Sequence, residues 1–342
     1  MRVEEFDYHL PTSLIAQYPS PQRGETSLMI VHRPTSEVEH RSFRDIIRYL
    51  NPADLLVMNN TRVLPARIIG KKETGGRVEM LLIPSSNGAN GEWKALIKGS
   101  GKMKKGTRIR FPQGLEGEIE EIKGGIGNVR FSYQGKLMDI LQKIGHIPLP
   151  PYIKRRDEPL DRDRYQTVYA ERDGSIAAPT AGLHFTQDLL QSLKEEGIRT
   201  TTITLHIGIG TFAPIKAFDI ENHAMEAEWV EISEETAIEI EEAKARGGKV
   251  IAVGTTTTRA LESLSNGKGG VKPGSGLTSL FIYPPYRFRV IDGLVTNFHL
   301  PKSTLIMLVS AFLGKDLMMK TYQEAIRRKY RFYSYGDAML IL

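Results

Sequence analysis

The sequence predicts an α/β domain, a mixed sheet with flanking helices, into which a small antiparallel β-barrel is inserted. Strand-like and helix-like segments alternate along residues 150–342, which is typical of an α/β domain. Residues 67–134 instead form short strand-like segments separated by glycine-rich turns, which is typical of a small barrel or sandwich. We therefore expect a discontinuous sheet domain, residues 1–65 and 150–342, interrupted by a barrel domain at 66–149.

The barrel segment is defined by hydrophobic and charged residues that alternate one by one. This alternation covers 77–82, 92–98 and 108–111, and each stretch is long enough for one strand. Lys123-Gly124-Gly125 supplies a tight turn between two further strands. Pro148-Leu149-Pro150-Pro151 forces an extended conformation and marks the exit from the barrel.

The remaining chain contains buried strands and capped helices. Strands are predicted at 55–58, 200–207, 249–253 and 294–300. Helices are predicted at 188–196, after the capping residue Ser233, at 259–264 and at 303–313. The glycine- and serine-rich segment 265–276 is predicted to be a loop, either a lid over a site or a plain solvent-exposed connection.

The composition limits the chemistry and the location. None of the 342 residues is cysteine, which excludes disulfides, thiolate zinc sites, cysteine nucleophiles and cysteine-bound iron–sulfur clusters. The eight histidines are scattered without a metal-binding spacing, so we expect no metal. The longest apolar stretch, 305–313, is too short for a membrane span and the N-terminus lacks a signal pattern, so we expect a cytoplasmic protein without membrane contact. As a separate expectation, the protein is a monomer. A net charge of +6 indicates a polyanionic partner.

Polar residues gather at predicted strand ends, where ligands bind in open α/β sheets. Segment 205–212 places His206 before two glycines that permit close approach of a ligand, although a tight turn with a structurally bonded histidine would look the same. Segment 252–259 leads through one glycine and four threonines into a helix N-terminus. Such an end suits a carboxylate or phosphate, while simple capping by one threonine is the alternative.

Two further segments carry candidate site residues. Segment 295–304 places Asn297 and His299 on one strand face and Lys302 beside a capped helix start, although a core histidine with an ordinary cap fits as well. Segment 176–186 is rich in small residues that permit close approach of a flat ligand, and the alternative is a tight packing loop.

Long motifs follow one another along nearly the whole chain. They include Asn59-Asn60-Thr61-Arg62-Val63-Leu64-Pro65 and Thr204-Leu205-His206-Ile207-Gly208-Ile209-Gly210-Thr211-Phe212, and others lie at 6–11, 14–19, 146–153, 164–170, 177–186, 254–256, 296–305 and 330–340. In this order they resemble the tRNA ribosyltransferase-isomerase family of queuosine synthesis. The chain departs from the usual family pattern at Leu28, Glu226 and Pro285.

This resemblance implies an unusual use of S-adenosylmethionine as co-substrate, without a prosthetic group. Its ribosyl group would be transferred to 7-aminomethyl-7-deazaguanine at the wobble position of tRNA and isomerised, giving epoxyqueuosine-tRNA and releasing adenine and methionine. Two rivals are an S-adenosylmethionine-dependent RNA methyltransferase, suggested by the strand and glycine at 250–254, and a non-catalytic RNA-binding protein.

Such a reaction needs a base, an acid and groups that hold the co-substrate, which leads to specific residue hypotheses. We expect proton transfer by His206, His299 and His184, since a free histidine titrates near neutrality. The expected substrate- and cofactor-binding residues are Arg62, Tyr165, Thr180, Thr255, Thr256, Asn297, Lys302 and Asp337. The expected tRNA-binding residues on the barrel are Lys98, Lys102, Lys104, Lys105, Arg108 and Arg110, although these charges could merely keep the barrel soluble.

Overall fold

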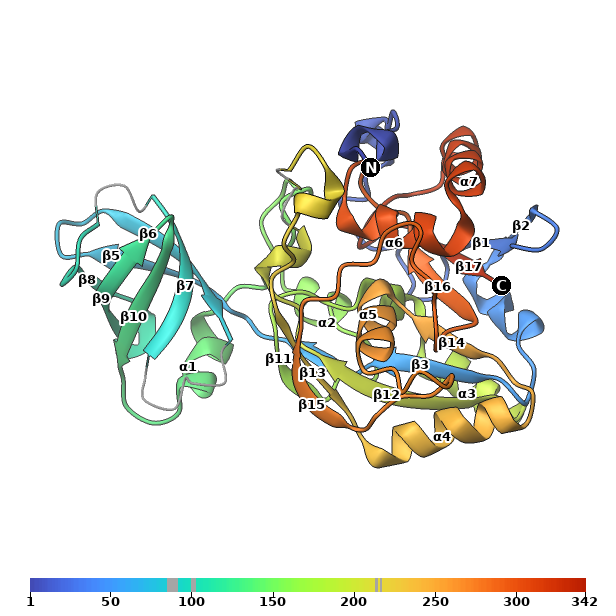
Figure 1. Ribbon diagram of the computed structural model, residues 1–342. Coiled ribbons are helices and arrows are strands. Elements are labelled where there is room, and N and C mark those ends of the chain that lie inside the picture. The colour runs from blue at the N-terminus through green and yellow to red at the C-terminus, as the bar shows by residue number, and fades with distance from the viewer. Residues whose placement is uncertain (85–91, 100–102, 213–214, 216) are drawn as a thin grey trace.

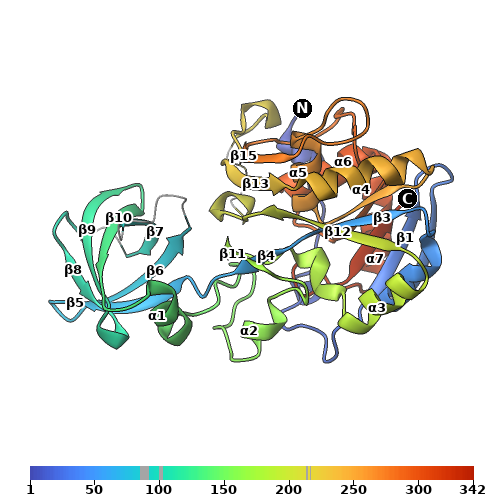
Figure 2. The same cartoon turned by 90° about the horizontal axis from the view of Figure 1, so that it is seen from below.

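The computed structural model describes residues 1–84, 92–99, 103–212, 215 and 217–342. Figure 1 shows a large body built on a sheet with helices around it and a smaller body that is a barrel. The predicted fold class, a mixed α/β sheet with an antiparallel barrel, is confirmed. In Figure 2 the barrel stands apart from the sheet and is joined to it by chain segments around β4 (Thr61–Val63).

In the described part of the chain, the large sheet has nine strands of mixed direction. Its central strands β12, β3, β14 and β16 run parallel, whereas β17 is antiparallel to β16 and parallel to β1. In spatial order the strands are β15 (Gly274–Thr278), β13 (Glu228–Ile232), β12 (Arg199–Leu205), β3 (Leu55–Asn59), β14 (Val250–Val253), β16 (Gly293–Asn297), β17 (Ala338–Ile341), β1 (Ser27–His32) and β2 (Glu37–Ser42).

Hydrophobic side chains on both faces of this sheet are buried by helices. Leu55 and Val57 of β3 pack into one core with residues of α4 (Glu234–Ala245), α5 (Thr255–Ser263), α6 (Thr304–Leu313) and α7 (Lys315–Arg327). Leu56 and Met58 point the other way, into a core with α3 (Gln187–Glu195) and the 3-10 helix η3 (Phe43–Tyr49). Burial on both faces explains why β3 is a continuous hydrophobic run rather than an alternating one.

Three parts of the sheet domain differ from the prediction. Helix α5 begins at Thr255 rather than at 259, and in its first turn the hydroxyls of Thr257 and Thr258 donate to the carbonyls of Val253 and Gly254 (2.7 and 3.1 Å). The predicted loop 265–276 ends in the edge strand β15, which pairs with β13. Strands β1 and β17 and helix α7 are not among the predicted elements.

The barrel confirms the predicted alternation. Its strands close in the order β10-β7-β6-β5-β8-β9, and Val78, Met80 and Leu82 on β6 are buried inside. Gly124 and Gly125 both have positive φ (60° and 86°), as a tight turn between β9 and β10 requires. The barrel elements are β5 (Arg67–Lys72), β6 (Arg77–Ile83), β7 (Glu92–Lys98), β8 (Arg108–Arg110), η6 (Pro112–Gly114), β9 (Glu116–Lys123), β10 (Ile126–Ser132) and the adjoining helix α1 (Leu137–Ile144).

Short elements connect the two bodies and line the sheet edge. Strand β4 pairs in parallel with β11 (Arg172–Ser175) between the barrel and the large sheet. The other short helices are η1 (Val3–Phe6), η2 (Thr12–Leu14), α2 (Asp161–Arg164), η7 (Thr180–His184), η8 (Ile209–Phe212) and η9 (Ile220–Asn222). Within the described ranges, no helix combines the length and the apolar character needed to cross a membrane.

Candidate active site

The carboxyl ends of the parallel strands β3, β14 and β16 meet at one edge of the sheet, where polar residues follow each strand. Asn59 ends β3, Gly254 follows β14, and Asn297 ends β16. The Asn59 amide donates to the carbonyl of Leu205 (2.9 Å) and to the hydroxyl of Thr256 (3.4 Å). These bonds fix the ends of β12 and β3 against the first turn of α5.

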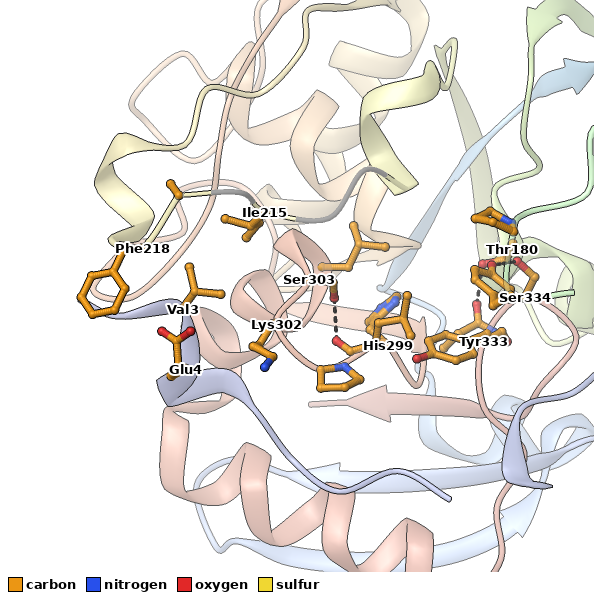
Figure 3. Close-up of a pocket in the computed structure, with 17 residues that line it drawn as sticks. Val3, Glu4, Thr180, Ile215, Phe218, His299, Lys302, Ser303, Tyr333 and Ser334 are labelled. Carbon is orange, nitrogen blue, oxygen red and sulfur yellow. Dashed lines mark hydrogen bonds between the residues drawn. The ribbon is translucent and has the colours of Figure 1, made fainter. Parts of the chain in front are cut away.

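A cavity of about 640 Å³, here called the main cavity, opens beyond these strand ends (Figure 3). Thr180, Tyr333 and Ser334 lie at one end, which is polar. Val3 and Phe218 lie at the other end together with the carboxylate of Glu4. Volumes of this size are typical of cavities that bind small molecules.

A second, smaller hollow of about 30 Å³, here called the inner recess, lies beside the main cavity and against α5. The two share Thr180, Asn297 and His299. The inner recess adds Thr255 and Thr256, both buried, at the helix N-terminus. With Lys302 on the wall of the main cavity, five predicted binding residues and one predicted catalytic histidine therefore line these two neighbouring hollows.

Asn297 is the centre of a buried hydrogen-bond network at the polar end. Its amide nitrogen donates to the carbonyl of Tyr333 (3.2 Å) and lies 3.4 Å from the carbonyl of Asp337. Carbonyl oxygens can only accept, so the amide orientation is fixed. The other amide atom, Oδ1, accepts from the hydroxyl of Thr180 (2.9 Å). Asn297 thereby joins η7 to the loop before β17.

His184 lies behind Asn297 and does not line the main cavity. Its Nε2 lies 3.0 Å from the amide nitrogen of Asn297, so Nε2 is the acceptor. Its Nδ1 therefore carries the proton and donates to Thr26 (2.8 Å). Burial lowers the pKa of His184 to about 3, and the ring stacks on Phe43. His184 is thus neutral, with both nitrogens bonded within the protein.

His299 lines both the main cavity and the inner recess. Its Nε2 is 2.7 Å from the hydroxyl of Thr296, and its backbone carbonyl accepts from the hydroxyl of Tyr8. Burial lowers the pKa of His299 to about 3, so the ring is neutral at pH 7. Of the three predicted catalytic histidines, His299 is the one placed in contact with the cavity.

His206, just after β12, points away from the main cavity and the inner recess. Alternation sends Ile207 into the inner recess and His206 toward Trp229, on which its ring stacks (5.1 Å between centroids). Its Nδ1 is 2.8 Å from the hydroxyl of Thr61. Partial burial and, to a smaller extent, Arg172 lower the pKa of His206. Among the described residues that line the main cavity, His206 is absent.

Three further predicted binding residues also lie outside the main cavity and the inner recess. Arg62 donates to the carbonyl of Ala170 (2.6 Å), and Tyr165 is fully buried in a separate hydrophobic cluster. The carboxylate of Asp337 accepts from the backbone amides of Ser27 and Arg331 (2.9 and 2.7 Å), although burial raises its pKa. These contacts stabilise the loops around the site.

Lys302 stands at the wall of the main cavity in an unusual backbone conformation. Its φ is 57°, and its backbone amide donates to the carbonyl of Phe6 (3.0 Å). Its ammonium group is 2.9 Å from the carboxylate of Asp7, which raises the pKa of Lys302. Lys302 therefore links the N-terminal segment to the loop after β16 and keeps its positive charge.

A model of the family described as queuosine biosynthesis protein matches residues 3–341. The chain belongs to this queuosine biosynthesis family. The S-adenosylmethionine:tRNA ribosyltransferase-isomerase of Halothermothrix orenii is 52% identical over 345 residues, and the protein of the same name from Pelotomaculum thermopropionicum is 51% identical; both alignments cover 100% of each chain. A crystal structure of S-adenosylmethionine tRNA ribosyltransferase from Thermotoga maritima is 38% identical, with a TM-score of 0.57, over 99% of this chain and 100% of that chain.

In this member of the family, several cavity residues are not among the predicted site residues. Tyr152 and Tyr333 stack on each other (4.6 Å between centroids), and the hydroxyl of Tyr152 lies 2.5 Å from that of Ser334. Val3 and Phe218 reach the cavity from segments far away in sequence. Tyr152 and Tyr333 lie inside the quoted motifs 146–153 and 330–340, which is the signal that could have identified them.

The predicted tRNA-binding residues of the barrel fall into two groups. Arg108 and Arg110 form ion pairs with Glu118 and Glu116 on the neighbouring strand (3.4 and 3.3 Å). Lys98, Lys104 and Lys105 are exposed, and no ion pair to them is found among the described residues. Lys102 lies outside the described residues. Nor does the described part of the chain contain a cluster of three His, Asp or Glu side chains able to hold a metal ion.

Proposed function

We propose that this chain transfers the ribosyl group of S-adenosylmethionine to 7-aminomethyl-7-deazaguanine at the wobble position of tRNA and isomerises it. The products are epoxyqueuosine-tRNA, adenine and methionine. The proposal rests on the full-length 52% identity to a relative that bears the name of this activity. The polar cavity at the strand ends supports it, because a non-catalytic RNA-binding protein needs no such cavity.

The shape of the main cavity suits a reaction between two flat, polar substrates. Its volume of about 640 Å³ gives room for the co-substrate and a nucleobase. The target base lies in an RNA loop, and proteins recognise such bases by splaying them out and stacking them on aromatic side chains. Phe218, exposed at the outer end, offers a stacking surface.

The residues around the main cavity supply the required roles. We assign proton transfer to His299, because of the three predicted histidines it is the one that lines the main cavity. Thr255 and Thr256 lie at the N-terminus of α5, whose free amides and dipole favour the carboxylate of the methionine moiety. Lys302 stands at the cavity wall as an ion pair with Asp7. His184 and Asp337 act from behind the cavity by holding Asn297 and its loop.

We further propose that the domains divide at 66 and 149 and that the barrel contacts tRNA. Residues 67–134 contain thirteen Lys and Arg against seven Asp and Glu, so this segment carries all of the chain's net charge of +6. A localised positive charge favours binding to a phosphate backbone. Exposed Lys98, Lys104 and Lys105 are the most available cations of this set, because Arg108 and Arg110 are already paired.

The test is incubation of the purified protein with S-adenosylmethionine and a tRNA that carries 7-aminomethyl-7-deazaguanine. We expect adenine and methionine in equal amounts and a mass gain on the modified base. S-adenosylhomocysteine together with a methyl-sized mass gain would instead identify a methyltransferase. Intact co-substrate and unchanged tRNA, with a folded protein, would refute the proposed function.

A further inference from the structure

Thr180 stands at the end of a chain of hydrogen bonds in which the direction of every bond is determined. Starting from the cavity, the Thr180 hydroxyl donates to Oδ1 of Asn297 (2.9 Å). The amide nitrogen of Asn297 donates to Nε2 of His184 (3.0 Å). Nδ1 of His184 then donates to the hydroxyl of Thr26 (2.8 Å). We call Thr180, Asn297, His184 and Thr26 the relay.

The direction of the relay is set by groups that can only accept. The amide of Asn297 faces the carbonyls of Tyr333 and Asp337, so its nitrogen cannot exchange places with Oδ1. Oδ1 has no hydrogen, so the hydroxyl hydrogen of Thr180 must lie on the bond to Asn297. A hydroxyl has one hydrogen and two acceptor lone pairs. Once its hydrogen is committed, Thr180 can only accept further hydrogen bonds.

Thr180 lines both the main cavity and the inner recess, so this polarity determines what can bind there. We propose that Thr180 is a specificity-determining residue that accepts a hydrogen bond from an N–H or O–H group of S-adenosylmethionine, and that His184 is a positioning residue that fixes this polarity through Asn297. The proposal rests on the proposed function for the identity of the co-substrate. A ligand acceptor atom, such as a carboxylate oxygen, is disfavoured at Thr180 because two lone pairs would face each other.

The donor on the co-substrate can be the ammonium group, a ribose hydroxyl or the 6-amino group of adenine, and two ligands separate the ammonium from the nucleoside donors. S-adenosylmethionine carries both groups, whereas 5′-deoxy-5′-methylthioadenosine keeps the ribose hydroxyls and lacks the ammonium. We expect Thr180→Val, which preserves shape and removes the hydroxyl, to weaken S-adenosylmethionine binding about 10-fold in calorimetry. Weaker binding of both ligands would assign the donor to the nucleoside, and weaker binding of S-adenosylmethionine alone would assign it to the ammonium.

Conservative and matched variants separate recognition from a general loss of structure. Thr180→Ser keeps the hydroxyl and should restore most of the affinity. Thr321→Val makes the same chemical change on α7, where the hydroxyl donates to the carbonyl of Leu317 (2.7 Å), and should leave ligand binding unchanged. Unchanged affinity of Thr180→Val for S-adenosylmethionine would overturn the proposal. The proposed function would fail separately, if the wild-type protein released no adenine.

The role of His184 has its own readouts. Nitrogen-15 NMR of the wild-type protein should show His184 as the neutral Nδ1–H tautomer, and an Nε2–H tautomer would overturn the relay. His184→Leu should weaken S-adenosylmethionine binding, and combination with Thr180→Val should add little further loss, because residues of one network are not additive. His184→Gln offers an oxygen to the Asn297 amide and should bind more tightly than His184→Leu. Fully additive losses would show that His184 does not act through Thr180.

Discussion

His184, His206 and His299 are identical in side chain, but the fold gives each a different set of neighbours. His184 has both ring nitrogens bonded inside the protein, His206 stacks on Trp229, and His299 lines the main cavity. Solvent exclusion disfavours the charged imidazolium, which is why the buried rings of His184 and His299 have a pKa of about 3. Their environment decides which of them can meet a substrate.

The neutral state of His184 predicts a pH-dependent stability. Its pKa is about 3 in the folded protein and near 6.5 when unfolded, so below pH 6.5 the unfolded chain binds the additional proton. The stability is therefore complete above pH 6.5 and is lost as the pH falls toward 3. Between pH 8 and pH 5, we expect the free energy of unfolding of the wild type to fall by about 2 kcal/mol more than that of His184→Gln.

Urea denaturation at the two pH values measures this difference, because the other titrating groups are common to both proteins. Equal losses of stability in the wild type and in His184→Gln would show that His184 takes up its proton in the folded state. His299 also has a pKa of about 3, so the free energy of unfolding of the wild type should again fall more than that of His299→Gln between pH 8 and pH 5.

The contrast between His299 and His206 predicts unequal effects on catalysis. His299→Ala should lower kcat for adenine release by about 100-fold or more, the usual contribution of a general acid or base. His206→Ala should lower it by less than about 10-fold, since its ring packs on β4 and β13 rather than on the main cavity. Circular dichroism and thermal melting confirm the fold of each variant. If kcat fell more for His206→Ala than for His299→Ala, the proton-transfer role would belong to His206 instead of His299.

At the scale of elements, α5 is held against β13 by a buried ion pair. Arg259 and Glu228 are each about 3% exposed, and their side chains form a salt bridge. Arg259 also donates to the carbonyl of Leu280 (2.9 Å), and Glu228 accepts from the backbone amide of Gly208 (2.8 Å). The pair thus connects the helix that borders the inner recess with the loop that follows β12.

Removal of Arg259 takes the opposite charge away from the buried carboxylate of Glu228. Arg259→Met should therefore lower the free energy of unfolding by about 3–5 kcal/mol. The control is Arg172→Met, because Arg172 pairs with Glu231 on the same strand but both side chains are exposed (53% and 38%). That exposed pair should contribute less than about 1 kcal/mol. Urea denaturation measures both free energies of unfolding. Similar losses in Arg259→Met and Arg172→Met would show that the buried pair contributes no more to stability than the exposed pair.

Elements with local signals could be predicted from the sequence, and elements that depend on distant partners could not. Hydrophobic and polar residues alternate along the barrel strands because one face of each strand is buried. The hydroxyls of Thr186 and Ser233 accept from backbone amides in the first turns of α3 and α4, which makes these residues N-caps. Strand β17 lies between β16 and β1, a position that only the assembled sheet defines. Strand β15 is a glycine-rich edge with Leu277 exposed, so it lacks an alternating pattern.

The same distinction applies to the site. Thr180, Asn297 and His299 could be proposed because polar residues at strand ends stand out in the sequence. The apolar wall from Val3 and Phe218 carries no such signal, since hydrophobic residues are common everywhere in a folded protein. The direction of the relay required the structure, because it depends on which carbonyls face the amide of Asn297.

At the scale of the whole molecule, charge is divided unevenly between the two bodies. The barrel segment 67–134 holds the entire net charge of +6, whereas acidic and basic residues balance in the remainder. A reaction on tRNA needs the anticodon loop at the main cavity and the stem on a positive surface. The division of charge fits a barrel that binds the phosphate backbone and a sheet domain that performs the chemistry.

This arrangement predicts a salt-dependent role for the exposed barrel lysines. Changing Lys98, Lys104 and Lys105 together to Gln should weaken tRNA binding and reduce the slope of log affinity against log salt by roughly 0.7–0.9 for each phosphate that the protein no longer neutralises. The affinity for S-adenosylmethionine should not change, since these residues lie on the barrel and not on the main cavity.

The matched variant changes Arg108 and Arg110 to Gln. Glu118 and Glu116 already neutralise these arginines. Removal of the two arginines should therefore change the salt slope of tRNA affinity less than removal of Lys98, Lys104 and Lys105. Fluorescence anisotropy with labelled tRNA at several salt concentrations measures both slopes. If the lysine variant kept the wild-type slope, the phosphate-binding surface would have to lie on the sheet domain, and the net charge of the barrel would serve only its solubility.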